Sequence, residues 1–368
     1  MSQNNQAPIT KPKAIILDCE GAALTQDEIA LFKKHNPYGF ILFKRNCETP
    51  EQVKKLVTQL RDAVGRPDAP VLIDQEGGTV ARLKAPEFEE FPPAKTFKDL
   101  GEQDSKRAAR ATYLNAVLMA RQLSDLGIDV NCTPVLDIPV KGSHDFLAGS
   151  RVYGETPEQV TVLGQAICEG HLDQGVTPIL KHIPGHGRAT SDSHFEMPKI
   201  AAKKQDLETQ DFKPFQHMAT QSWGEGAWAM TAHVVYQDVT DTPGTLSKDV
   251  IDLIRHDIGF NGVLIADDIS MKALQGDMPT IAKQTLEAGC DLTLLCNQDF
   301  ETRKSVLEAV PEITLDAEKR LKKAEDIRQK SKKQVDIKAV SKELNELLSG
   351  DPIADERNRN RHGSGRKP

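Results

Sequence analysis

The sequence of 368 residues has no long hydrophobic segment, and only 5% of its residues are aromatic. Its longest apolar runs, such as GFILF and DLTLLC, are far shorter than the roughly 20 residues that a membrane-spanning helix needs. The start of the chain, MSQNNQAPITKPK, also lacks the apolar stretch of a signal peptide. We therefore expect a cytoplasmic protein that makes no membrane contact.

Basic residues are in the minority. The chain has 47 Lys and Arg against 54 Asp and Glu, which gives a net charge of −7. Nucleic-acid binding depends largely on a basic field that attracts phosphates, and this composition does not supply one. The charge balance favours a small-molecule ligand and no nucleic-acid partner.

Cysteines are few and scattered. The six of them, at positions 19, 47, 132, 168, 290 and 296, form no Cys-x-x-Cys pair and no Cys/His framework of the kind that structural zinc uses. We expect reduced, mostly buried thiols.

Eight short apolar runs are present, with helix-period segments between them. The runs are 13–18, 39–43, 70–74, 128–134, 177–182, 227–233, 262–268 and 291–296. The intervening helical segments are 25–35, 49–64, 105–127, 156–175, 203–219, 247–259 and 279–289. The runs are too continuously apolar for half-exposed antiparallel strands. Eight buried strands that alternate with helices favour an α/β fold of the (β/α)8 barrel type over an open sheet of five or six strands.

Helix starts are marked by residues that cap helix N-termini. Thr25, Thr49, Thr156 and Ser247 each stand immediately before a helical segment, where a side-chain oxygen accepts a hydrogen bond from a free backbone N–H. These four residues are predicted N-caps.

One domain is expected, with extensions at both ends. Residues 1–12 are predicted to be disordered, and 13–335 to form a single catalytic domain. Residues 300–349 are charged and helix-rich, and should provide the eighth helix and an appended one. Residues 336–368 are predicted to form a C-terminal helix and a disordered charged tail, because the chain from 350 onward has almost no apolar content.

Ionisable residues end several of the apolar runs. They are Asp18, Asp74, Lys181, His182, His233, Asp267 and Asp268. In a (β/α)8 barrel the carboxyl ends of the strands carry the active site. Charged groups at the ends of buried strands need partners, so their convergence at one rim argues for function. Because neighbouring strand residues face opposite ways, we expect Asp267 and Asp268 to have different roles.

The segment after the fifth run, LKHIPGHGRATSDSHFEMP, concentrates histidines: His182, His186 and His194. Asp192 and His194 are two positions apart, so in an extended loop they project to the same side. The carboxylate would then fix the imidazole tautomer and leave the other nitrogen to exchange a proton with substrate. The same residues would also make a set of metal ligands, and the loop alone leaves both interpretations open.

The segment IDQEGGTVARL, at 73–83, has no G-x-G-x-x-G pattern. Gly77 and Gly78 therefore indicate a tight turn and not a nucleotide-binding loop. Asp74 and Arg82 in the same segment are suited to hold a polyhydroxylated ligand through charge-assisted hydrogen bonds.

Taken together, the strings IDQEGG, KHIPGHG, DSH, MTAH and ADDISM resemble the catalytic domain of glycoside hydrolase family 3. The resemblance is to the single-domain bacterial β-N-acetylglucosaminidases (β-hexosaminidases) that recycle cell-wall muropeptides, and it covers about residues 13–300. It implies exo-acting, retaining hydrolysis of terminal non-reducing β-linked N-acetylglucosamine through a covalent glycosyl-enzyme.

The resemblance also implies roles for individual residues. Asp267 corresponds to the nucleophile, and His194, assisted by Asp192, to the acid/base. The usual Ser before the nucleophile is Ala266 here, and the usual Phe of KHFPGHG is Ile183. Neither departure removes a reacting group, and the resemblance implies neither a bound metal nor a cofactor.

The remaining implied roles concern sugar binding. Asp74, Arg82, Lys181 and His182 correspond to residues that bind sugar hydroxyls, together with Arg151 in GSRVYGE. His233 is expected to line the pocket, and His186 to hold the loop in shape.

Three alternatives remain open. A His base avoids the repulsion that a carboxylate would present to phosphate, so the same pocket suits a β-N-acetylglucosaminide phosphorylase. A metal-dependent hydrolase would use the loop histidines as ligands, and a sugar-binding protein would have the pocket without the chemistry. In each case we expect a monomer.

Overall fold

All eight predicted strands are present, and they close into a barrel. The computed structural model describes residues 11–145, 149–193 and 195–349. The barrel strands are β1 (Lys13–Leu17), β2 (Pro37–Leu42), β3 (Val71–Ile73), β6 (Val130–Asn131), β7 (Thr177–Ile183), β9 (Trp228–Thr231), β11 (Val263–Asp268) and β12 (Leu292–Leu295). All neighbours are parallel, and β1 pairs with both β2 and β12. The predicted (β/α)8 barrel is confirmed.

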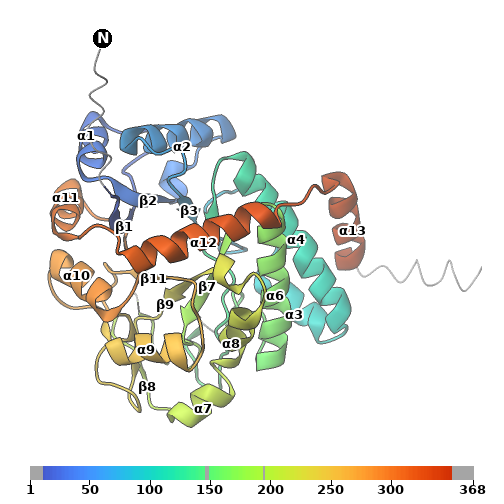
Figure 1. The fold of residues 1–368 in the computed structure, drawn as a ribbon. Helices are drawn as coiled ribbons and strands as arrows, with labels where there is room; N and C mark the ends of the chain where they lie inside the picture. Colours follow the sequence, from blue (N-terminus) through green and yellow to red (C-terminus); the bar gives the residue numbers. More distant parts are fainter. Residues whose placement is uncertain (1–10, 146–148, 194, 350–368) are drawn as a thin grey trace, which may run out of the picture.

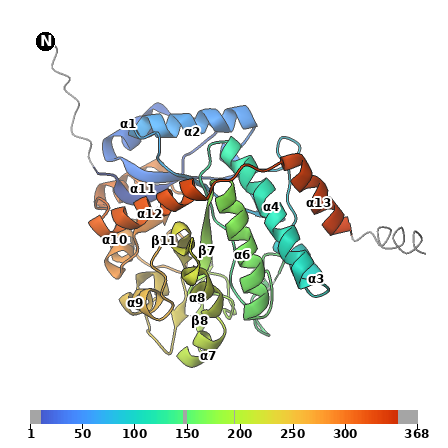
Figure 2. The same ribbon diagram turned by 45° about the vertical axis from the view of Figure 1, so that its right-hand side comes forward.

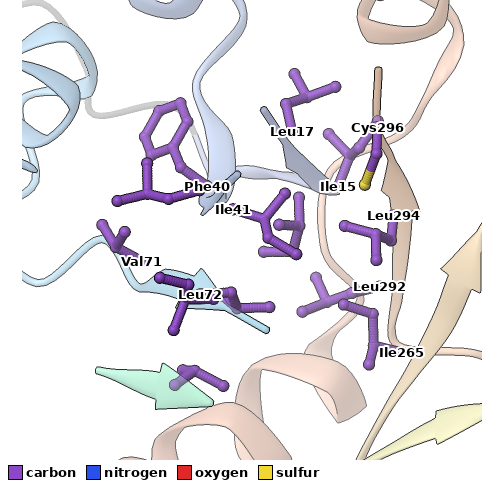
Figure 3. Close-up of a cluster of buried hydrophobic side chains, with 14 of the residues drawn as sticks. Ile15, Leu17, Phe40, Ile41, Val71, Leu72, Ile265, Leu292, Leu294 and Cys296 are labelled. Carbon is purple, nitrogen blue, oxygen red and sulfur yellow. The ribbon is translucent and has the colours of Figure 1, made fainter. Parts of the chain in front are cut away.

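The side chains of the barrel strands make up the core of the protein. Figure 3 shows part of this core, where side chains from β1, β2, β3, β11 and β12 meet. Ile15, Phe40, Leu72 and Leu292 are fully buried. Burial on both faces explains why the strands read as continuous apolar runs.

Helices surround the barrel (Figure 1). The main ones are α1 (Gln26–His35), α2 (Pro50–Val64), α3 (Ala94–Gly101), α4 (Ser105–Asp125), α6 (Pro157–Asp173), α9 (Lys248–His256), α10 (Met278–Ala288) and α11 (Phe300–Ala309). Short 3-10 turns are η1 (Lys44–Asn46), η2 (Gly224–Gly226) and η3 (Gly244–Leu246). Within the described ranges, no helix is both long enough and apolar enough to cross a membrane.

The four predicted N-caps are confirmed. The side chains of Thr25, Thr49, Thr156 and Ser247 each accept a hydrogen bond from a backbone N–H in the first turn of the helix that follows. At Thr25 the bond is reciprocal, because Glu28 accepts from the Thr25 backbone N–H at 3.0 Å.

The helical segment expected over 203–219 is interrupted. It forms α7 (Lys204–Thr209) and α8 (Lys213–Thr220), and Pro214 lies in the first turn of α8. Proline has no N–H to bond to the preceding turn, and its ring clashes with the carbonyl four residues earlier. The prediction of one continuous helix was therefore wrong.

Helix α12 (Leu315–Ser331) covers the amino-terminal end of the barrel and crosses the front of the view in Figure 1. Arg320 binds Asp291 at 2.7 Å, and Arg328 donates to the Gly175 carbonyl at 2.7 Å. Asp291 directly precedes β12, and Gly175 lies two residues before β7. The carboxyl end of the barrel is thus the end that α12 leaves uncovered.

The appended helix α13 (Ile337–Ser349) lies along the outside of α4, as Figure 2 shows. Arg110 of α4 forms an ion pair with Glu343 at 2.7 Å, and Arg107 donates to the Leu347 carbonyl at 2.8 Å. The predicted C-terminal helix is thus present. The disorder predicted for the two ends of the chain concerns mainly 1–10 and 350–368, which lie outside the described residues.

Two small sheets sit outside the barrel. Strands β4 (Gln75–Gly77) and β5 (Val80–Ala81) form an antiparallel hairpin, and β8 (Lys199–Ile200) pairs in parallel with β10 (Val235–Tyr236). Gly77 and Gly78 in the hairpin have φ angles of 95° and 61°. These left-handed conformations favour glycine, which confirms the predicted tight turn.

The cysteines match their prediction. All six are free; Cys47 is partly buried and the other five are buried.

Candidate active site

A pocket of about 410 Å³ opens at the carboxyl ends of the strands. Its walls come from the ends of several barrel strands and from the loops that follow them. Six of the predicted site residues line it: Asp74, Arg82, Arg151, Lys181, His182 and Asp267. The folding of the barrel thus brings together residues that are up to 193 positions apart in the sequence (267 − 74).

A network of opposite charges forms one wall. The Asp74 carboxylate lies 2.9 Å from Arg82 Nη2 and 3.2 Å from Lys181 Nζ. Lys181 also contacts Glu76 at 2.7 Å, and Arg151 holds both Glu76 oxygens, at 2.8 and 2.9 Å. The bidentate geometry fixes the guanidinium plane.

The network keeps its members ionised despite burial. Desolvation alone would raise the pKa of Glu76, but Arg151 and Lys181 outweigh it and lower that pKa to about 2. The pKa of Asp74 is lowered in the same way, against its desolvation, by Lys181 and Arg82. Burial opposes the charge of Lys181, but Glu76 and Asp74 raise its pKa above the usual value.

Glu76 was not predicted as a site residue. It lies two positions after Asp74, so both carboxylates project to the same side of the chain. That spacing was visible in IDQEGG and would have identified it.

A second group, behind the pocket, centres on Asp137, which was also missed. Its Oδ2 lies 2.7 Å from His182 Nδ1, and its Oδ1 accepts the backbone N–H of His182 at 3.3 Å and of His186 at 2.6 Å. Burial would raise the pKa of Asp137, but His182 lowers it to about 2. An ionised carboxylate only accepts hydrogen bonds, so His182 carries a proton on Nδ1.

His182 therefore turns its other nitrogen to the pocket. Its Nε2 is 4.0 Å from Asp267 Oδ2. Asp137 thus orients the ring, and Nε2 faces the carboxylate at the end of β11.

Asp267 and Asp268 have different environments, as expected. The Asp267 Oδ1 accepts the backbone N–H of Asp268 at 2.8 Å. Burial would raise the pKa of Asp267, yet His182 and His233 outweigh that effect and lower it below the usual value. Asp267 is therefore an ionised carboxylate at neutral pH.

The Asp268 carboxylate is held by groups that follow β11 and β12. It accepts hydrogen bonds from Ser270 N and Oγ at 3.0 and 2.8 Å, and from Cys296 N at 3.0 Å. Burial raises the pKa of Asp268 to about 7, although these bonds favour the ionised form. The side chain ties the loop after β11 to the end of β12.

Two predicted residues lie behind or away from the pocket wall. His233 is buried, with Nδ1 2.7 Å from Thr245 Oγ1 and Nε2 3.0 Å from the Asp268 carbonyl oxygen. Asp18, which directly follows β1, is buried in an ion pair with Arg45 and accepts the backbone N–H of Asn297 at 2.6 Å. The convergence expected at the rim thus does not extend to Asp18, whose ion pair is structural.

The histidine-rich loop reaches the pocket through Ser193, which is buried and part of the wall. The Ser193 carbonyl accepts the Ala273 N–H at 3.2 Å, and the Asp192 carbonyl accepts the Phe195 N–H at 3.0 Å. Asp192 thus directly precedes a pocket residue. His194, the predicted acid/base, lies outside the described residues.

In the described part of the chain, one group of side chains has the spacing of a metal site: Asp137, His182 and His186. The His182 Nδ1 and the Asp137 carboxylate are already hydrogen-bonded to each other. Burial lowers the pKa of His186 to about 4, so that ring is neutral, and its buried Nε2 has no hydrogen-bond partner in the described part.

Chemically, the pocket combines an ionised carboxylate, an oriented imidazole and a wall of charged hydrogen-bonding groups. A carboxylate in this setting attacks or stabilises an electron-poor carbon. The charged wall offers both donors and acceptors, which suits a ligand with several hydroxyl groups.

Known proteins show the same combination of fold and sequence. Residues 10–328 match the N-terminal domain of glycosyl hydrolase family 3. A beta-hexosaminidase of Alkalilimnicola ehrlichii is 33% identical over 301 residues, which cover 81% of this chain and 84% of that protein.

Solved structures of known proteins are also similar to this chain. NagZ from Neisseria gonorrhoeae, in complex with N-trifluoroacetyl-D-glucosamine, has a TM-score of 0.81 and 29% identity, and the match covers 92% of this chain and 99% of NagZ. The same protein has also been solved in complex with a zinc ion, with a TM-score of 0.79 and 28% identity over 92% of this chain and 98% of NagZ. The family expected from the five sequence strings is confirmed: this chain belongs to glycosyl hydrolase family 3, in its β-hexosaminidase group.

Proposed function

We propose that the protein is a retaining exo-β-N-acetylglucosaminidase that removes terminal non-reducing N-acetylglucosamine from muropeptide fragments during peptidoglycan recycling in the cytoplasm. The observation that carries the proposal is the ionised Asp267 facing a pocket walled by hydroxyl-binding charges. The relative NagZ, in complex with a glucosamine derivative, supports the choice of sugar. We propose a monomer that needs no cofactor, with the catalytic domain over 13–335.

In the first step, Asp267 attacks the anomeric carbon while the glycosidic C–O bond breaks. His194, assisted by Asp192, donates a proton to the leaving oxygen, and the sugar remains covalently bound to Asp267. In the second step, neutral His194 takes a proton from water, whose oxygen attacks the same carbon and releases Asp267. Two inversions retain the β-configuration.

The charged wall holds the sugar during both steps. Asp74, Arg82, Lys181 and Arg151 present acceptors and donors to its hydroxyl groups. In its neutral form, His182 accepts from a hydroxyl at Nε2, because Asp137 keeps the proton on Nδ1. His233 acts from behind, because it holds the backbone of Asp268 next to the nucleophile.

The size of the pocket agrees with an exo action. Ligand pockets usually measure about 300–1,000 Å³, and this pocket of about 410 Å³ lies near the small end. It suits one terminal sugar better than an internal segment of a polymer.

Release of 4-nitrophenol from its β-N-acetylglucosaminide tests the proposal, with purified protein in a chelator, with and without phosphate. We expect the same rate of release with and without the chelator, and with and without phosphate. Formation of sugar 1-phosphate that rises with phosphate would identify a phosphorylase. Loss of activity in the chelator and its recovery with zinc would identify a metal-dependent hydrolase. Sugar binding without turnover would identify a binding protein.

A further inference from the structure

Gln75 stands between two carboxylates of the pocket wall and points the other way. Because side chains alternate along an extended chain, Asp74 and Glu76 face the pocket while Gln75 faces the protein interior, where it is fully buried. Buried amide groups in native proteins are hydrogen-bonded. The partners of Gln75 therefore show what holds this part of the wall in place.

The side chain of Gln75 holds the segment that follows β5. Its Oε1 accepts the backbone N–H of Arg82 at 2.9 Å and of Leu83 at 3.1 Å, and its Nε2 donates to the Leu83 carbonyl at 3.1 Å. Arg82 is also the partner of Asp74 in the pocket wall. One buried amide thus ties together the two segments of the hairpin that supply charged groups to the wall.

The backbone of Gln75 is held in turn by Asn131, which belongs to β6. Asn131 Oδ1 accepts the Gln75 N–H at 2.9 Å, and Asn131 Nδ2 donates to the Gln75 carbonyl at 2.9 Å. Only one orientation of the Asn131 amide satisfies both bonds, because a flipped amide would place donor against donor and acceptor against acceptor. Asn131 therefore fixes the hairpin to a strand of the barrel.

His171, in α6, fixes Asn131 from behind. His171 Nε2 lies 2.9 Å from Asn131 Nδ2, and its Nδ1 lies 2.9 Å from the Ile167 carbonyl oxygen. A carbonyl only accepts, so the ring proton is on Nδ1, and Nε2 accepts the second N–H of the Asn131 amide. Burial lowers the pKa of His171 to about 4, which keeps the ring neutral at pH 7.

The side chains of Gln75, Asn131 and His171 are buried, and none of the three is part of the pocket wall. We propose that they form a positioning network, which sets where the charged hairpin meets the terminal sugar. The network acts on the substrate only through the wall residues that it holds. This inference rests on the proposed function and deepens it, because it names residues that set the affinity for the sugar without touching it.

Variants of His171, the most remote member, test the network. His171→Leu leaves the second N–H of Asn131 without an acceptor, and the cost of an unsatisfied buried donor should shift the amide and raise KM about ten-fold. His171→Gln restores an acceptor near the position of Nε2 and should keep KM within about two-fold of the wild type. His171→Met, whose sulfur accepts weakly, should give an intermediate KM and serves as the comparison if His171→Leu does not fold.

The readout is KM and kcat on 4-nitrophenyl β-N-acetylglucosaminide and on the disaccharide of two β-linked N-acetylglucosamines. The terminal sugar is the same in both, so KM should rise by the same factor. The kcat should stay within about two-fold of the wild type, because the wall holds the sugar equally in the ground state and the transition state.

Two further variants separate positioning from loss of stability. Leu321→Ala removes a buried side chain of α12, at the opposite end of the barrel, and should destabilise the fold without changing KM. His171→Leu should add little to the effect of Asn131→Ala, because His171 acts through the amide that this second variant removes.

The outcomes distinguish the two proposals. The positioning network would be overturned by a wild-type KM in His171→Leu, by an equal rise in Leu321→Ala or His171→Gln, or by fully additive effects of the His171 and Asn131 variants. Wild-type protein that cleaves neither substrate would overturn the proposed function. Calorimetric dissociation constants for N-acetylglucosamine would then replace KM in the same comparison, and an absence of binding would overturn both proposals.

Discussion

The Asp137 carboxylate lies 2.7 Å from Nδ1 of His182, and this contact decides which nitrogen of the imidazole accepts a hydrogen bond in the pocket. Oδ1 of Asp137 is already engaged by the backbone N–H groups of His182 and His186. The carboxylate is therefore held from three directions, and His182 is oriented by a rigid partner toward Asp267.

Asp137→Asn should reverse the tautomer of His182. The two backbone N–H groups keep the amide oxygen at the position of Oδ1, so the NH2 group faces Nδ1 and moves the ring proton to Nε2. Nε2 then no longer accepts from a sugar hydroxyl, and kcat/KM should fall about 10- to 100-fold, the kinetic equivalent of a lost buried hydrogen bond.

The matched control for that variant is Asp129→Asn. Asp129 forms an ion pair with Arg61 at 2.8 Å, next to the start of β6 and far from the pocket. The Asp129→Asn variant should lower the free energy of unfolding without lowering kcat/KM. Equal kinetic losses in both variants would argue against an orienting role for Asp137.

Glu76→Gln should destabilise the fold by about 3 kcal/mol, because removing one partner of a buried ion pair leaves Arg151 and Lys181 undercompensated. The pKa of Glu76 in the folded protein is about 2, below its ordinary value of 4.5. Its contribution to stability is thus complete above about pH 4.5 and is lost as the pH falls toward 2.

Denaturant unfolding of wild type and Glu76→Gln between pH 7 and pH 3 measures this effect. The difference in unfolding free energy should narrow as the pH falls below about 4.5. A constant difference across that range would show that the charge of Glu76 does not stabilise the fold.

Asp267→Asn and Asp268→Asn should separate the two adjacent carboxylates. An amide at 267 is no nucleophile, so turnover of 4-nitrophenyl β-N-acetylglucosaminide should fall at least about 1,000-fold with the fold intact. An amide at 268 still accepts the Ser270 and Cys296 N–H groups through its oxygen, so the loss should be about ten-fold. Near-native activity of Asp267→Asn, with circular dichroism as the folding check, would rule out its assigned role.

His194→Ala should affect poor leaving groups most. A sugar leaving group needs a proton as its bond breaks, whereas 4-nitrophenolate leaves without one. The ratio of kcat/KM on the disaccharide to that on the nitrophenyl glycoside should therefore fall by about 100-fold, a size typical of general acid catalysis. Equal losses on both substrates would contradict the acid role.

The fold could be predicted from the sequence because its signals are local. Continuous apolar runs gave the eight strands, and Thr25 or Thr49 before a helical segment gave helix starts. Asp137 was missed because it lies in the apolar stretch VLDIP beyond a predicted strand, and only the fold shows that its carboxylate meets His182, 45 positions later. Similarly, the placement of α12 across one end of the barrel depends on ion pairs such as Arg320–Asp291 between residues 29 positions apart.

The central claim is that Asp267 forms a covalent bond to the sugar. The most direct test uses a 5-fluoro N-acetylglucosaminyl fluoride, which slows the second step, followed by intact-protein mass spectrometry and peptide mapping. We predict one glycosyl group per chain, attached to Asp267 and absent from Asp267→Asn. A label on another residue, or full turnover without any label, would contradict the assignment of the nucleophile.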